Sequence, residues 1–434
     1  MKKLFSMILI VLTTIANSQE TIYPAKPNTS TITLINATIH IGNGQVIEKG
    51  FVVIKADKIE AVGDMASFKG NSSTAINLDG KHIYPGFILP TSQLGIKDIG
   101  GNAVRGSNDY VELGDYNPNI RSIAAYNTDS KIIRTVLTNG ILLAQIVPQG
   151  SLISGTSSIV QLDAWNYEDA GYAVDNGIHF YMPSLLARPG GRFSAFLSAS
   201  QNDPLKEAYD KIESVKQMLR EAKTYYTDTK ATPNLKLDAV KGLFNGKQKL
   251  FVHCNQVKQM LMAIDIAKEF ELQLVIVGGS DSWQIADLLK QNNVAVILSQ
   301  QHSLPTADDD AVDQPYKQAT TLQKAGVLFC INDDDEQNRG RNLPFNAGTA
   351  AAYGLTQEEA LQAITLNTAK VLGIEAKTGS IEVAKDANII VSEGDVLDMR
   401  TSKIIHAFIQ GRKVTLDDKH KQLNDRYMKK YGLK

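Results

Sequence analysis

Short apolar runs alternate with amphipathic segments through the middle of the chain. Runs without polar interruption are typical of parallel strands that are buried on both faces. Between them, apolar residues recur three and four positions apart, as in Val257, Met260, Leu261 and Ile264, which predicts helices with one apolar face. The predicted strands of this region are 140–147, 178–182, 249–253, 274–277, 294–298 and 327–331. This alternation predicts an α/β fold with a parallel sheet.

The first strand of the series lies in 84–95, where Pro85 and Gly86 open an apolar run. The run becomes polar at Thr91 and Gln93. A buried strand that turns polar at its carboxyl end is where a barrel enzyme places its active site. With this strand the count is close to eight, which favours a TIM-type (β/α)8 barrel over a doubly wound sheet.

Turn and capping residues predict where the other helices and loops of this region begin and end. Thr356, followed by Glu359, has the spacing of a capping box and predicts a helix over 356–372. The segment 152–162 alternates in polarity and predicts a hairpin, whereas the polar segment 100–121 predicts a lid over the barrel or a disordered loop. The other predicted helices are 122–137, 204–226, 237–244, 283–291, 316–325 and 343–353.

Both ends of the chain predict β structure rather than βα units. The predicted strands at these ends are 33–38, 51–55, 58–62, 387–392 and 403–414. They are short and rich in β-branched residues, and glycine, asparagine or aspartate turns separate them. The charged residues 417–434 predict a terminal helix.

Residues 1–18 form a predicted signal peptide. Two lysines precede an apolar stretch that is too short to span a bilayer, and Ala16 and Ser18 supply the small residues that a signal peptidase requires. The mature protein is therefore expected to begin at Gln19 and to be periplasmic or extracellular.

The chain has a balanced charge. Its 434 residues carry 45 Lys and Arg against 46 Asp and Glu, a formal net charge of -1. This balance argues against a nucleic-acid partner. No later stretch reaches the roughly 20 apolar residues of a membrane-spanning helix. The two cysteines, Cys254 and Cys330, lack the spacing of a metal or redox motif and are expected to be core thiols.

Several stretches occur in the order of a known family pattern. The strand at 84–95 keeps the frame of Pro-Gly followed by aliphatic residues, and Lys-Ile-Glu-Ala-Val-Gly stands at 58–63. Further matches are Asn-Leu-Pro at 342–344, Tyr-Gly-Leu at 353–355, Ile-Thr at 364–365, Leu-Gly at 372–373 and Gly-Ser-Ile-Glu at 379–382. Together these stretches resemble the amidohydrolase superfamily, and within it the imidazolonepropionase-like branch.

The resemblance covers essentially the whole mature chain and implies two domains. Residues 84–376 would form the (β/α)8 barrel. Residues 19–83 and 377–416 would combine into a small composite β-sandwich domain, and 417–434 would form a helical tail.

The resemblance also assigns positions to a metal site. The family's first strand carries a His-x-His pair that binds a metal, and Thr91 and Gln93 stand there in this chain. The ligand histidines of the fifth and sixth strands match Asn255 and Gly278, whereas the ligand and proton-shuttling aspartate of the eighth strand matches Asp333. The resemblance therefore implies a degenerate metal site. No cofactor is expected unless a divalent metal such as zinc binds in an unconventional way.

Two functional hypotheses follow. By resemblance the protein is a hydrolase that acts on carbon–nitrogen bonds, with Asp333, His253 and His302 as candidate catalytic residues. For both His253 and His302 the alternative is a structural role. Alternatively, it is an inactive amidohydrolase-fold protein that binds a small molecule or peptide, or a partner subunit of an active paralogue. Formation of an oligomer is compatible with both.

Overall fold

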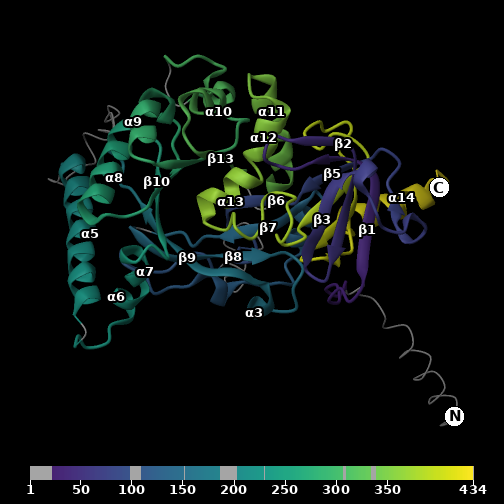
Figure 1. The fold of residues 1–434 in the computed structure, drawn as a ribbon. Helices are drawn as coiled ribbons and strands as arrows, with labels where there is room; N and C mark the ends of the chain where they lie inside the picture. Colours follow the sequence, from purple (N-terminus) through teal and green to yellow (C-terminus); the bar gives the residue numbers. More distant parts are fainter. Residues whose placement is uncertain are drawn as a thin grey trace, which may run out of the picture.

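Two eight-stranded sheets organise the protein, one forming a nearly closed barrel and the other a separate β domain (Figure 1). The computed structural model describes residues 22–97, 109–150, 152–185, 203–228, 230–305, 309–333 and 339–433. The predicted signal peptide and part of the predicted lid lie outside the described residues. Among the helices of the described part, none is long and apolar enough to cross a lipid bilayer.

The barrel strands follow one another in chain order around the sheet. They are β6 (Phe87–Ser92), β7 (Ile141–Ile146), β8 (Ile153–Gln161), β9 (Gly171–Tyr181), β10 (Lys249–Cys254), β11 (Leu274–Gly278), β12 (Ala295–Leu298) and β13 (Phe329–Ile331). All pair in parallel except β8, which is antiparallel to both neighbours. The barrel prediction is confirmed, with this one strand reversed.

The reversal of β8 corrects the hairpin predicted within 152–162. That segment is a single strand, and it forms hairpins with β7 and β9 instead. The connections on either side are too short for the crossover helix that a parallel strand needs, and only α3 (Tyr167–Ala170) lies between β8 and β9. The chain therefore has to run back beside the strand that it has just left.

The two end strands of the barrel sheet, β13 and β6, are connected through the backbone of residues 363 and 364, where one helix ends and the next begins. The amide of Ile331 donates to the carbonyl of Ala363 at 3.0 Å, and the amide of Ile88 donates to the carbonyl of Ile364 at 3.1 Å. The helix predicted over 356–372 is accordingly two helices, because the intervening carbonyls bond to the strands. The predicted capping box at Thr356 is confirmed.

The remaining helices lie around the barrel, except α14, which lies at the edge of the molecule beside the β domain (Figure 1). They are α2 (Lys131–Leu137), α5 (Pro204–Thr227), α6 (Leu235–Ala239), α7 (Lys241–Phe244), α8 (Val257–Phe270), α9 (Ala286–Gln291), α10 (Gln314–Ala325), α11 (Leu343–Ala352), α12 (Gln357–Gln362), α13 (Leu366–Leu372) and α14 (Lys419–Lys430). The helix predicted over 122–137 is shorter and is preceded by the 3₁₀ turn η4 (Ser122–Ala125). Between them the Asn127 side chain accepts the amide of Asp129 at 3.0 Å, a local turn that competes with helix.

The second sheet combines strands from both ends of the chain. Its strands are β1 (Thr31–His40), β2 (Val46–Lys55), β3 (Lys58–Asp64), β4 (Ile76–Asn77), β5 (His82–Pro85), β14 (Ile389–Ser392), β15 (Ile404–Ile409) and β16 (Arg412–Lys413). The two groups join where β5 pairs antiparallel with β14, from Pro85 opposite Ile389 to His82 opposite Ser392. One apolar core, which includes Leu34 and Phe408, serves strands from both ends.

A buried ion network links the β domain to the barrel. Asp163, which follows β8, is 1% exposed and accepts from Arg134 on α2 at 3.3 Å and from Arg412 on β16 at 3.1 Å. The amide of Ala25 donates to the same carboxylate at 2.8 Å. A buried carboxylate is stable only when it is paired in this way, so Asp163 fixes three segments relative to one another.

Inward-facing side chains form layers in the barrel. The apolar layer contains Ile88, Leu143, Ile159, Phe251, Val275, Ile297 and Cys330. His179 lies beside it, with its ring stacked 4.8 Å from that of Phe251. Its Nδ1 is 2.9 Å from Nε2 of His253, one layer nearer the carboxyl ends of the strands. The Gln145 amide donates to the hydroxyl of Ser157 at 3.1 Å on the same inner surface.

Replacing Phe408 by alanine tests the shared core of the β domain. Phe408→Ala should lower the free energy of unfolding by about 3–5 kcal/mol, because the substitution leaves a cavity in a core built from both chain ends. Urea denaturation followed by circular dichroism measures this loss. Phe68→Ala is the control, since this half-buried ring lies 4.9 Å from Phe51 outside that core and should cost about 1 kcal/mol. Equal losses would contradict the shared core.

The pair formed by the buried His179 and the partly buried His253 predicts a pH dependence of stability. Burial lowers the pKa of His179 well below its usual value and that of His253 to about 3. Below roughly pH 6.5 the unfolded chain binds protons that the folded chain does not bind. This stabilisation is therefore complete above that pH and is lost as the pH falls towards the folded pKa, by at most about 1.4 kcal/mol per pH unit for each histidine.

Urea denaturation between about pH 7.5 and pH 5 measures this slope. His179→Gln should make the slope smaller than in the unmodified protein. His420→Gln, at an exposed position on α14, should leave the slope unchanged. Identical slopes for all three proteins would show that the buried pair does not contribute to acid sensitivity.

Candidate functional site

The residues assigned to the metal site lie at one end of the barrel. Thr91 is the next-to-last residue of β6, and Asn255 immediately follows β10. Gly278 ends β11, and Asp333 lies two residues beyond β13. Because these strands run in parallel, their carboxyl ends meet at the same barrel mouth, where this fold carries chemistry.

Thr91 is bonded to the opposite edge of the barrel sheet. It is 5% exposed, and its hydroxyl accepts from Nδ2 of Asn332 at 2.5 Å. The Thr91 amide donates to Oδ1 of Asn332 at 3.4 Å. The sequence analysis did not identify Asn332 as a partner of Thr91. Gln93, in the other position of the family pair, is half-buried, and its carbonyl accepts the amides of Ile96 and Lys97 in a turn.

Gly278 and Asn255 lie against each other. Gly278 has φ +96°, and a Cβ atom added there would lie 2.5 Å from Oδ1 of Asn255 and 3.2 Å from the carbonyl of Cys254. The same Oδ1 accepts from the hydroxyl of Ser280 at 3.1 Å. This positive φ favours glycine, and a larger side chain at position 278 would be strained and would have to displace the Asn255 amide.

His253 points into the barrel and is held by two aromatic side chains. Besides its contact with His179, its ring stacks on that of Tyr181 with a centroid distance of 3.9 Å. The structure therefore pairs His253 with His179 in a buried layer. His179 and Tyr181 lie opposite Phe251 and His253 on neighbouring strands, and their two-residue spacing was the available signal in the sequence.

Asp333 and His302 are brought together by Asn346 of α11, which is 1% exposed. Its Nδ2 donates to Oδ2 of Asp333 at 3.0 Å. Its Oδ1 accepts the amides of Gln301 at 2.8 Å and His302 at 3.3 Å. One amide side chain thus connects the segments that follow β12 and β13.

Thr349 completes this cluster from the next turn of α11. Its hydroxyl lies 2.6 Å from Nε2 of His302. Burial lowers the pKa of His302, so the imidazole is neutral at pH 7. Asn346 and Thr349 are three residues apart on one helix face, and the sequence analysis named neither of them. These hydrogen bonds link a carboxylate, an amide, an imidazole and a hydroxyl near the ends of β12 and β13, and the carboxylate and the amide are almost fully buried.

These donors do not fit a catalytic transition metal. Such a metal needs about three strong ligands, normally imidazole, thiolate or carboxylate. Thr91, Asn255 and Gly278 offer a hydroxyl, an amide and no side chain at all. In the described ranges no three His, Cys, Asp or Glu side chains are grouped so that they could hold a metal ion. No reaction step through a metal is therefore assigned to these residues.

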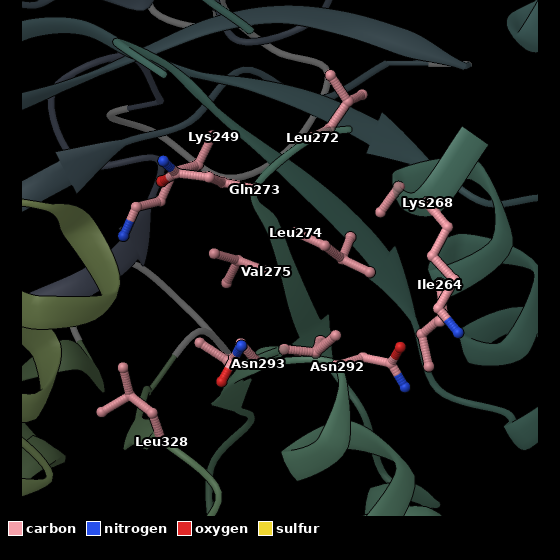
Figure 2. A pocket seen from close by; sticks show the side chains of 13 residues that line it. Lys249, Ile264, Lys268, Leu272, Gln273, Leu274, Val275, Asn292, Asn293 and Leu328 are labelled. Carbon is pink, nitrogen blue, oxygen red and sulfur yellow. The ribbon is translucent and has the colours of Figure 1, made fainter. Parts of the chain in front are cut away.

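A cavity of about 380 Å³ lies at the other end of the barrel (Figure 2). Its lining includes Lys249, Leu274 and Ala295, the first residues of β10, β11 and β12. The Lys249 ammonium donates to the carbonyls of Lys370 at 3.0 Å and Val371 at 2.8 Å, where α13 ends. This cavity is separate from the mouth and lies at the end of the barrel that is associated with stability rather than catalysis.

Sequence comparisons match parts of the chain. The model of the Amidohydrolase family matches residues 275–414. The imidazolonepropionase of Thermoplasma volcanium is 37% identical over 87 residues, which are 20% of this chain and 22% of that protein. The imidazolonepropionase of Symbiobacterium thermophilum is 31% identical over 112 residues, 25% of this chain and 24% of that protein. The matched segments span about a quarter or less of these relatives.

Solved structures match over nearly the whole fold. An amidohydrolase from Thermotoga maritima MSB8 superimposes with a TM-score of 0.74 at 22% identity and covers 88% of this chain and 99% of its own. A prolidase complexed with N-methylphosphonate-L-proline has a TM-score of 0.54 at 16% identity, covering 89% of this chain and 100% of its own. The family model, the sequence relatives and the fold all support a place in the amidohydrolase superfamily.

Proposed function

We propose that this chain is an exported amidohydrolase-fold protein with a degenerate metal site, which functions as a binding protein rather than as a metal-dependent hydrolase. The observation that carries the proposal is the contact between Gly278 and Asn255. Metal-assisted hydrolysis needs a bound water whose pKa the metal lowers towards neutrality. A mouth that keeps Asp333 but holds short neutral groups or no side chain at the other ligand positions has too few strong ligands to retain that metal.

The chemistry of the mouth suggests the kind of ligand. Asp333 supplies a carboxylate that Asn346 holds in place, and the less buried His302 and Thr349 supply an imidazole and a hydroxyl. Such a set suits a small polar molecule with amide-like donors and acceptors. The named relatives are imidazolonepropionases, so an amide, a cyclic ureide or a short peptide is the proposed ligand class. An active paralogue is the proposed partner.

A second candidate function rests on the Asp333 cluster. Asn346 holds the Asp333 carboxylate and also accepts the backbone amide of His302, so Asp333 is a positioned candidate for the general base towards a water that attacks a carbon–nitrogen bond. A positioned base typically contributes about 10²–10⁴-fold to a rate. This is far below what a metal-bound hydroxide adds, so the activity expected from this arrangement is slow.

Metal content and hydrolysis decide between the two functions. After incubation with zinc and dialysis, the protein should retain far less than one metal per chain, and hydrolysis of dipeptides and cyclic ureides should stay at background. The double variant Thr91→His/Gln93→His should not restore activity, because positions 255 and 278 still lack imidazoles. Elemental analysis and product detection by chromatography measure both properties.

Either of two results would overturn the binding-protein proposal. About one metal per chain, removable by a chelator together with activity, would establish a metal-dependent hydrolase. A slow, chelator-resistant hydrolysis that falls about 10²-fold or more in Asp333→Asn would establish the second candidate. Asp210→Asn, on the exposed surface of α5, is the matched control and should leave such a rate unchanged.

Export is part of the proposal and has its own test. The motive is the pair of lysines, the apolar stretch and the small residues at Ala16 and Ser18. The mature protein from its native host should begin at Gln19 and should be found outside the cytoplasm. N-terminal sequencing of that protein would contradict export if it showed an intact Met1.

A further inference from the structure

The helix α14 has no fully buried residue and lies at the edge of the molecule (Figure 1). Its Tyr427 and Tyr431 are 45% and 64% exposed, and Leu433 beyond it is 67% exposed. Large apolar side chains that project in a group are uncommon on a surface without a partner. The helix therefore presents a face that no other described part of the chain covers.

Positive charge is concentrated on this segment. Between 419 and 433 five residues are lysine or arginine and one is aspartate, although acidic and basic residues are almost equal in number over the whole chain. Lys419, Arg426 and Lys430 are spaced seven and four residues apart, so they share one side of the helix. The average charge of the chain does not reveal this local excess.

The basic groups and the aromatic rings of α14 contact one another. The Tyr427 and Tyr431 rings stack with centroids 6.4 Å apart. The Lys430 ammonium lies 5.8 Å from the first ring and 5.3 Å from the second, and the Arg426 guanidinium lies 5.7 Å from the Tyr427 ring. Cations and tyrosines thus form one mixed face, here called the basic-aromatic face.

The helix is fixed to the body at its first turn. Asp418, only 5% exposed, accepts the amides of His420 at 2.7 Å and Lys421 at 2.9 Å. The same carboxylate accepts the hydroxyl of Thr138 beyond α2. This capped, buried anchor holds the basic-aromatic face outwards.

We propose that the basic-aromatic face binds the surface of an anionic phospholipid bilayer. Lysine and arginine are attracted by anionic headgroups, and tyrosines favour the boundary between headgroups and acyl chains. An amphipathic helix with a basic face binds such a surface in its plane. An acidic protein partner would have to supply a concave site for two protruding tyrosines on a single convex helix, whereas a bilayer accommodates them without one.

Sedimentation with vesicles tests the proposal on the full mature protein. Vesicles of phosphatidylcholine with about one third phosphatidylglycerol should bind it, and pure phosphatidylcholine vesicles should not. Binding should weaken steeply between about 50 and 500 mM salt. The triple variant Arg426→Gln/Lys429→Gln/Lys430→Gln should bind about 100-fold more weakly, from about five-fold per charge.

Two further variants separate the causes. Lys69→Gln/Lys206→Gln/Lys247→Gln removes the same charge from exposed positions on other elements and should bind at least ten-fold more tightly than the α14 triple variant. Tyr427→Ser/Tyr431→Ser should weaken binding while leaving its salt dependence unchanged. Circular dichroism verifies that each variant is folded.

The proposal is overturned if the two vesicle types bind alike, or if both triple variants lose affinity equally. It is also overturned if the protein binds poly-L-glutamate in solution but not the anionic vesicles, because that result would identify an acidic protein as the partner. Each result is independent of whether the barrel mouth binds a ligand or hydrolyses one.

Discussion

The chain segment from His82 to Ser92 runs through both sheets, and Gly86 is where it passes from one to the other. β5 pairs with β14 on one side of this glycine, and β6 pairs with β7 on the other. The Gly86 amide donates to the carbonyl of Asn388 at 2.9 Å, and a Cβ atom there would lie 2.3 Å from Cδ1 of Leu142. Because backbone and barrel approach so closely, the position of Thr91 depends on strands from both chain ends.

The opposite edge of the barrel depends on a second set of bonds. β13 and β6 are bridged by the carbonyls of Ala363 and Ile364 and, nearer the mouth, by the pair of Thr91 and Asn332. Backbone groups at a sheet edge need partners, and here a break between two helices supplies them. The same bonds place Asn332 and Asp333 beside the first strand. The closure of the barrel and the arrangement of residues at its mouth therefore depend on the same contacts.

The sequence predicted the parts of the fold that have a strong local signal. Continuous apolar runs such as 274–277 identify parallel strands, and the pattern around Thr356 identifies a helix start. The sequence contains no such signal for the reversed strand β8. Its pattern of polar and apolar residues is compatible with a parallel or an antiparallel strand, and the short connections determine the direction. The helix break at Ala363 could not be predicted from the local sequence either, since it depends on strand edges that are far away in the sequence.

The location of the candidate residues could be predicted, but the hydrogen bonds that connect them could not. Family resemblance assigned Thr91, Asn255, Gly278 and Asp333 to one mouth, and the parallel strands end there. It could not indicate that Asn346 joins Asp333 to His302, because Asn346 belongs to a helix whose contacts arise only on folding. His253 was predicted from its strand, but its partner His179 lies on the neighbouring strand β9, and spacing within each strand does not give the register that brings the two together.

The groups at the mouth are compatible with a stable fold that contains no metal. Imidazoles gathered around an absent ion would leave buried polar atoms without partners, at a cost of about 1–3 kcal/mol each. Here the hydroxyl of Thr91 accepts a hydrogen bond from the amide of Asn332. The amide oxygen of Asn255 accepts from the hydroxyl of Ser280 and occupies the space beside Gly278. Short side chains that bond to one another hold the strand ends in the way that a shared ion otherwise would. A barrel whose mouth is fixed by its own hydrogen bonds can therefore keep its shape without a bound ion.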